Sequence, residues 1–189
     1  VGYWGGLSSR MGWIAEDEQG LPANARNYVE RLAGPYFACA AEWYETIGIG
    51  VTGGELDAIA RKHLDTPFFN LVLNPGHLIH IDEWMNTQVY PGSREPFVSQ
   101  QMVQVDIIPA AGPPYYGANI EDGIALLDKP GRDQLRSDFP DVWERVEARR
   151  AFMIDVLGIR LKPEVLPMSN LAGAMPPFWQ SPDRIVARA

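Results

Sequence analysis

The 189-residue chain contains a single cysteine, Cys39, so no disulfide can form within it. Scarce cysteine is usual in proteins of a reducing compartment. The sequence also lacks any run of about 18 uncharged apolar residues, the length that a membrane-spanning helix needs. A basic leader followed by an apolar stretch is missing as well. Together these absences predict a cytoplasmic protein that does not associate with membranes.

Basic residues are few: 16 Lys and Arg stand against 24 Asp and Glu, and the net charge is −8. Nucleic acids and anionic membranes are bound by clusters of Lys and Arg. We therefore expect neither as a partner. Hydrophobic residues, in contrast, make up 46% of the chain, which is enough for one domain with a real core over residues 1–189.

Common nucleophile and phosphate-binding motifs are absent too. The sequence has no G-x-S-x-G and no G-x-x-x-x-G-K. Cys39 lies within a helical apolar pattern, where a buried small side chain is the ordinary interpretation. Histidines and carboxylates are therefore the candidates for chemistry.

Apolar periodicity predicts two helices in the first third of the chain. Apolar residues recur at helical spacing over 24–47, with a kink or break expected at 34–35, where Gly precedes Pro. Thr52 and Glu55 have the spacing of a capping box. A second helix is expected from there to about His63.

The remainder of the chain is predicted to be richer in strands. Residues 2–14, which contain several glycines, suggest a bulged strand. Apolar and β-branched runs within 67–128 predict strands joined by turns. A last helix is expected over 140–157, followed by a Pro-rich tail over 159–189. Helices, then strands, then a helix is an order typical of an α+β fold.

One short stretch, residues 76–84, gathers polar side chains that could carry chemistry. It places His77 and His80 beside Asp82 and Glu83. Imidazole and carboxylates together suit a divalent cation. On a strand the two histidines would point to opposite faces, because side chains alternate with period two, so one of them at most reaches a given site. Ordinary histidines held by hydrogen bonds are the alternative.

Two further acids, Asp106 and Glu121, lie in otherwise apolar segments. Burying a carboxylate is costly unless it is paired or bound to a metal. Each acid is therefore either a candidate ligand or an exposed residue on an edge strand.

Three segments in this order resemble the metallopeptidase superfamily of methionine aminopeptidase, aminopeptidase P, prolidase and creatinase. A glycine-rich segment upstream adds to the likeness, which covers about residues 2–128 and leaves a helix and the Pro-rich tail over 129–189. The matching segments are 5–10, 76–84, 101–109 and 119–122.

The resemblance implies a pita-bread fold, here apparently without its front part, and a site of two metal ions held by two Asp, one His and two Glu. His77 falls on the metal-binding His and Glu121 on a bridging Glu. Asp106 stands next to the position of another Glu and would need a bulge to turn inward. The same stretch places His80, Asp82 and Trp84 around the pocket.

Several family ligands are replaced. One Asp falls on Gly6, one Glu falls on Ile107 or Ile108, and a proton-handling His falls on Trp84. The other Asp would lie before Val1. Two cations need several carboxylates to offset their repulsion. We therefore expect one weakly held Mn, Zn or Fe ion at most, with no metal as the equal alternative.

Two functions follow from the resemblance. The first is a divergent hydrolase of the Xaa-Pro peptidase or small-amide type, which acts on a small peptide or another small molecule through His77, Glu121 and Asp106. The second is a non-catalytic descendant that uses the pocket for binding or the fold for assembly, for example as a homodimer. We also expect His77 and Glu121 to approach each other, and the apolar segment 161–179 to pack over the pocket or a partner.

Overall fold

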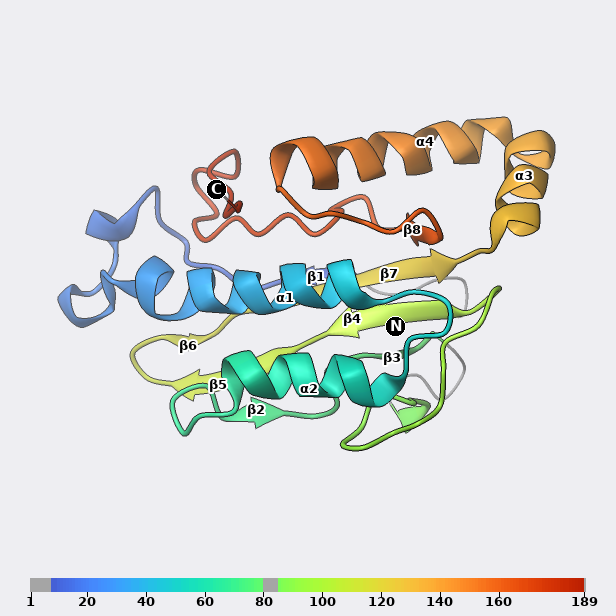
Figure 1. Ribbon diagram of the computed structural model, residues 1–189. Coiled ribbons are helices and arrows are strands. Elements are labelled where there is room, and N and C mark those ends of the chain that lie inside the picture. The colour runs from blue at the N-terminus through green and yellow to red at the C-terminus, as the bar shows by residue number, and fades with distance from the viewer. Residues whose placement is uncertain (1–7, 80–84, 189) are drawn as a thin grey trace.

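The computed structural model describes residues 8–79 and 85–188 of the chain. Within those residues, four α-helices and two antiparallel sheets form a mixed arrangement of α and β elements (Figure 1). This agrees with the expected combination of helices and strands. None of the described helices is long and apolar enough to cross a membrane.

The larger sheet has the strand order β1-β7-β4-β3, and β8 pairs with β7 on the same edge as β1. β4 and β7 are therefore interior strands. The strands of this sheet are β1 (Ser9–Arg10), β3 (His77–Leu78), β4 (Met102–Asp106), β7 (Ile120–Leu126) and β8 (Val165–Pro167). A smaller sheet joins β2 (Leu71–Val72), β5 (Ile108–Gly112) and β6 (Tyr116–Gly117).

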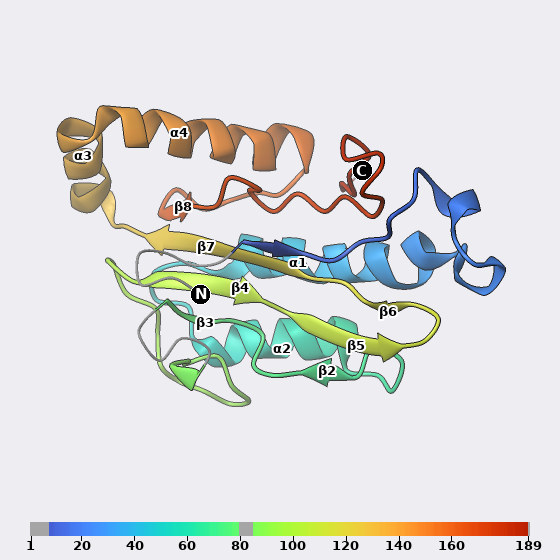
Figure 2. The same ribbon diagram turned by 180° about the vertical axis from the view of Figure 1, so that it is seen from behind.

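Helices α1 (Gly34–Thr46) and α2 (Gly53–Leu64) pack side by side against one face of the larger sheet (Figures 1 and 2). Val103 and Val105 of β4 and Ile124 of β7 are buried in the same apolar cluster as these helices. Figure 2, seen from behind, shows the opposite face of the sheet in front of α1 and α2. α1 and α2 therefore cover one face of this sheet.

Of the kink or break expected at residues 34–35, a break does not occur, and the helix is instead irregular just before Gly34. A π-helical turn, Val29–Ala33, leads directly into α1, and the Gly34 N–H donates to the Val29 carbonyl. Pro35 lacks an N–H, and in a regular α-helix its ring would collide with the carbonyl four residues earlier. The wider π turn just before it gives the ring room, so the helix continues.

The predicted capping box at the start of α2 is confirmed. The Glu55 N–H donates to the Thr52 hydroxyl oxygen at 3.3 Å, and the Thr52 N–H donates to the Glu55 carboxylate at 2.8 Å. The helix ends at Leu64, one residue beyond the expected end. Local hydrogen bonds alone define this start, which is why the sequence pattern located it.

The C-terminal part contains one more helix than expected. α4 (Pro140–Ala151) and the π-helical turn Phe152–Val156 replace the single predicted helix, and α3 (Lys129–Asp138) precedes them. α3 buries none of its residues. Leu135 is its one large apolar residue, which is too few to set a helical repeat, so the sequence pattern missed this helix.

The apolar tail is packed rather than trailing, as expected, but it lies at the edge of the larger sheet. β8 extends that sheet beside β7, and Leu166, Met175 and Phe178 are fully buried. The Gly173 N–H donates to the Asp122 carboxylate at 2.8 Å. Because Asp122 projects toward α1, Gly173 lies on that side of the sheet, whereas Leu166 packs with Ala125 and with Val146 of α4.

The strand predicted over residues 2–14 appears only as β1 in the described part of the chain. Its continuation is irregular: Trp13 forms an isolated bridge to Phe178 in the tail. Residues 1–7 lie outside the described residues. The apolar run at 68–72 is likewise shorter than expected, with β2 as its strand.

Cys39 is fully buried in α1, as the helical pattern indicated. Burial raises the pKa of its thiol to about 12, and the nearby Glu42 adds to the increase. The thiol is therefore un-ionised near neutral pH, and the thiolate is the reactive form. We expect iodoacetamide to label Cys39 only after denaturation, as measured by mass spectrometry. Fast labelling of the folded chain would contradict the buried position.

Candidate metal centre

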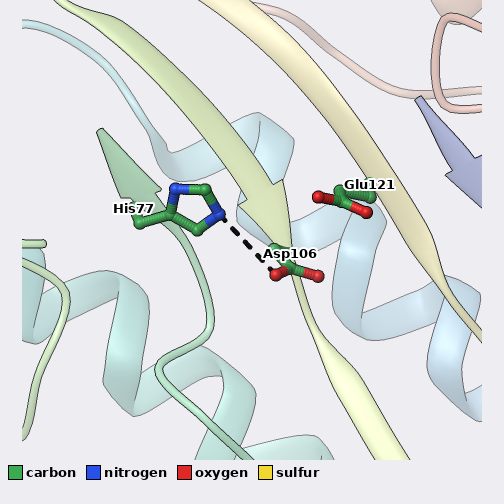
Figure 3. A group of neighbouring side chains, drawn as sticks. All are labelled: His77, Asp106 and Glu121. Carbon is green, nitrogen blue, oxygen red and sulfur yellow. Dashed lines mark ion pairs between the residues drawn. The ribbon is translucent and has the colours of Figure 1, made fainter. Parts of the chain in front are cut away.

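Three neighbouring strands bring His77, Asp106 and Glu121 together (Figure 3). Each residue offers one ligand atom, and these atoms all lie within 4.8 Å of one another. His77 Nε2 is 3.6 Å from Asp106 Oδ2. The expected approach of His77 and Glu121, which are distant in sequence, is confirmed.

The register of the strands places the three side chains on one face. Asp106 of β4 pairs directly with Glu121 of β7, and His77 of β3 pairs with Gln104, two residues before Asp106. Directly opposite residues, and residues two apart along a strand, project to the same side of a sheet. Asp106 therefore lies on the same face as Glu121 and His77. No bulge is needed, because the pairing of β4 with β7 is regular.

This face is the one that α1 and α2 do not cover. Asp122, the neighbour of Glu121, accepts a hydrogen bond from the Tyr44 hydroxyl of α1 at 3.3 Å. Adjacent strand residues point in opposite directions, so Glu121 points away from α1. Figure 3 shows the three side chains in front of the strands, with helices behind.

A tight turn positions His77 at the start of β3. Gly76 has φ +135°, and a Cβ there would lie 2.9 Å from Trp43 Cζ2 of α1. Glycine is suited to this position for two reasons: it adopts positive φ without strain, and it has no Cβ to collide with Trp43. The Asn74 amide and the Thr87 hydroxyl donate to the Gly76 carbonyl at 2.9 and 2.7 Å. These contacts set where the chain enters β3.

The alternative of exposed acids on an edge strand is wrong for both carboxylates. Asp106 is only 6% exposed and lies on an interior strand, and Glu121 is half-buried on another. Two carboxylates so close together repel each other and are costly to desolvate. Asp106 Oδ1 is buried and accepts no hydrogen bond from residues 8–79 and 85–188. A bound cation would satisfy that oxygen.

The imidazole of His77 is oriented as a ligand would be. Its Nδ1 lies 3.1 Å from the Leu78 carbonyl oxygen, which can only accept. Nδ1 therefore donates to that carbonyl, and Nε2 is the ring nitrogen that faces Asp106. Histidines that bind a metal through one ring nitrogen usually donate a hydrogen bond from the other ring nitrogen.

The spacing of His77 and Asp106 suits a shared cation better than a direct hydrogen bond. A separation of 3.6 Å exceeds hydrogen-bond length. Two ligands about 2.1 Å from a tetrahedral ion stand about 3.4 Å apart. The observed distance is close to that value, so His77 and Asp106 could share a small divalent ion.

Gln104 belongs to the same site, although the sequence pattern did not single it out. It is fully buried opposite His77, and its Nε2 donates to Glu121 Oε1 at 2.9 Å. A hydrogen bond to a ligating carboxylate orients it. A polar residue two positions before Asp106 in an apolar strand was the signal that could have revealed it.

Ile107 and Ile108, on one of which a family Glu falls in the resemblance, carry hydrocarbon side chains. Ile107 is fully buried, and Ile108 begins β5. Neither offers an oxygen, while Asp106 supplies one from the adjacent position. The predicted pocket residues His80, Asp82 and Trp84 lie outside the described residues, so their roles stay predictions.

Comparison with protein-family profiles and with curated proteins gives no match. Among solved structures, the chain is similar to the crystal structure of dipeptidase PepE from Mycobacterium ulcerans, with 23% sequence identity and a TM-score of 0.46. The likeness covers 64% of this chain and 30% of that chain. The chain thus corresponds to less than a third of that dipeptidase, and the structural likeness is distant.

Proposed function

We propose that this chain forms a metal-dependent hydrolase site for peptide or small amide bonds, in which His77, Asp106 and Glu121 hold one divalent cation. The observation that supports this most is the donor set itself. Three ligand atoms from three strands lie within 4.8 Å of one another, and Asp106 Oδ1 is buried without a hydrogen bond from the described residues.

The pita-bread metallopeptidases are the proposed family. The three donors come from the three segments that resemble that superfamily, one donor from each segment. Their common face supports the resemblance, because the family gathers its ligands across one pocket. The substrate class that goes with it is a Xaa-Pro peptide or a small amide.

The chemistry divides between the ion and the side chains. A divalent cation at this position supplies a Lewis acid for the substrate carbonyl and lowers the pKa of water. His77, Asp106 and Glu121 would hold that charge on the face of the sheet opposite α1 and α2. Gln104 holds the Glu121 carboxylate in place through its 2.9 Å hydrogen bond. The two carboxylates balance the charge of one divalent ion.

We propose one ion rather than two. Two-metal sites hold their ions about 3.5–4 Å apart and share carboxylates between them. In the described part of the chain, two carboxylates and one imidazole make up the donor group. Ile107 and Ile108 add no oxygen, so a second charge would stay uncompensated.

Metal titration tests the proposal directly. We expect one equivalent of Mn²⁺, Zn²⁺ or Fe²⁺ to bind per chain by calorimetry, with a single anomalous peak beside His77 and Glu121. Hydrolysis of Xaa-Pro dipeptides or simple amides should disappear with a chelator and return with the metal. Two peaks about 3.5 Å apart would restore a dinuclear site. No metal and no hydrolysis would leave a binding or assembly protein instead.

A further inference from the structure

A groove lies between α4 and the tail segment 170–174, and it shares no lining residue with the candidate metal centre. Figures 1 and 2 show the chain after β8 running alongside α4. The volume of the groove is about 320 Å³, at the lower end of the range of about 300–1,000 Å³ found for ligand sites. The lining residues are Ala148, Arg149, Phe152, Asn170, Leu171, Ala172 and Ala174.

The walls of this groove are mostly apolar, and the tail wall is held in place. Leu171 is 40% exposed, and Phe152 is half-buried opposite small alanine side chains. Ala172 has φ +44°, a backbone conformation that residues with a Cβ adopt only at a cost. The Ala174 N–H donates to the Leu171 carbonyl at 2.8 Å, which closes this turn. The groove is therefore shaped before any ligand enters it.

Arg149 is the one charged residue of the lining, and its charge is not balanced. Two other arginines of α4 have carboxylate partners. Arg145 lies 3.3 Å from Asp141, and Arg150 lies 3.6 Å from Glu147. Within residues 8–79 and 85–188, the contacts of Arg149 are to neutral acceptors. The groove therefore combines an apolar surface with one positive charge that is open to an anion.

The neutral contacts of Arg149 hold its guanidinium and leave donors over. Nη1 donates to the Pro167 carbonyl at 3.4 Å, and Nη2 donates to Asn170 Oδ1 at 2.5 Å. A guanidinium has five N–H donors, so others remain for a further acceptor. Because Asn170 accepts through its oxygen, its amide nitrogen is a donor beside them. Burial lowers the pKa of Arg149, and the positive charge of Arg145 adds to that decrease.

The helix dipole does not account for Arg149. A basic residue in the last turn of a helix offsets the partial negative charge of the C-terminal carbonyls, and the effect falls off beyond that turn. α4 continues through the π-helical turn Phe152–Val156, so Arg149 precedes the last turn. Its position beside the groove needs a different explanation.

We propose that this groove binds a small monocarboxylate with an apolar body. The carboxylate contacts Arg149 and Asn170, and the apolar part lies between Phe152 and Leu171. The planar guanidinium matches a carboxylate through two parallel hydrogen bonds. One unbalanced positive charge fits one negative charge, whereas a phosphate monoester carries about −1.5 to −2. The small volume favours a free molecule, and the proposal does not depend on the metal centre.

Three probes that differ in charge and in apolar length test the site in the metal-free protein. Hexanoate has both features, hexanamide has the same body without the charge, and acetate has the charge without the body. Binding is followed through the backbone signals of Leu171, Ala172 and Ala174 in ¹H–¹⁵N spectra. We expect hexanoate to bind about tenfold more tightly than either of the other probes, because hydrogen bonds to charged groups and apolar burial both contribute.

Arg149→Gln should weaken the binding of hexanoate about tenfold and leave that of hexanamide unchanged. Arg145→Gln is the matched control, since it removes an arginine of the same helix that lies outside the groove lining and is paired with Asp141. It should change the affinity for hexanoate by less than about twofold. Leu171→Ala, which keeps the charge, should weaken hexanoate about threefold and leave acetate unchanged. Thermal unfolding checks that each variant is folded.

Four outcomes would overturn the proposal. The first is the absence of any shift with millimolar hexanoate, and the second is equal affinity for hexanoate and hexanamide, because the charge of Arg149 would then play no part. The third is an equal loss of affinity in Arg145→Gln and Arg149→Gln, which would place the anion elsewhere on α4. The fourth is tighter binding of a hexapeptide with a free C-terminal carboxylate than of hexanoate, since the occupant would then be a protein terminus.

Discussion

Asp106→Asn should lower the affinity for a divalent cation by about 100-fold or more and remove metal-dependent hydrolysis. The substitution keeps the shape of the side chain but takes away one of two negative charges at the site. A cation that loses a carboxylate in a partly desolvated position is destabilised by several kcal/mol. Calorimetric titration of wild type and variant measures the change.

Thermal unfolding of the same variant is a second measurement, and the direction of the change in the unfolding midpoint can be predicted. Without metal, Asp106→Asn removes the repulsion between two carboxylates, so the midpoint should stay equal or rise. With saturating metal, wild type should gain about 2.7 kcal/mol at a concentration 100 times its dissociation constant. The variant should lose that gain.

Asp57→Asn is the matched control. Asp57 is 2% exposed in α2 and accepts hydrogen bonds from Arg61 at 2.7 and 3.2 Å. The same chemical change there should alter stability without altering metal affinity. If instead Asp106→Asn unfolds the metal-free chain, and metal never stabilises wild type, Asp106 is a structural residue and the metal centre is wrong.

The second large effect is expected at Asp122. Its carboxylate forms a fully buried ion pair with Arg10 at 2.6 Å, and it accepts hydrogen bonds from the Tyr44 hydroxyl and the Gly173 N–H. Arg10 also donates to the Ala174 carbonyl. Asp122→Ala leaves the Arg10 charge buried without its partner. We expect the free energy of unfolding to fall by about 3–5 kcal/mol, measured by urea denaturation.

An exposed ion pair provides the comparison. Asp141 and Arg145 lie 3.3 Å apart in α4, with side chains 73% and 57% exposed. Asp141→Asn should change the free energy of unfolding by less than about 1 kcal/mol, because solvent screens such pairs. Similar losses for Asp122→Ala and Asp141→Asn would mean that the Arg10–Asp122 pair is not buried as described.

Local features of the fold were predictable where local contacts define them. Thr52 and Glu55 satisfy each other's backbone groups, so their spacing alone located the start of α2. The turn to α1 at Pro35 was not predictable in the same way. A π-helical turn depends on how the preceding residues pack, and the sequence pattern indicated only a kink or a break there.

Residue types and their order already nominated His77, Asp106 and Glu121 as ligands. The sequence alone left open which side of its strand Asp106 occupies, because a slip of one residue reverses every side chain. The pairing of Asp106 with Glu121 and of His77 with Gln104 settled that question. Strand register depends on contacts between residues that are distant in the chain.

Composition by itself determined two properties. The single cysteine excludes a disulfide within the chain, and the small number of basic residues disfavours binding to nucleic acid. The order of its motifs determined which residues to examine for a metal. Tertiary structure alone decided that Gln104 orients Glu121, that the tail joins the sheet beside β7, and that rings from three segments meet at Trp13. Each of these follows from burial and packing between distant segments, and neither periodicity nor spacing carries that information.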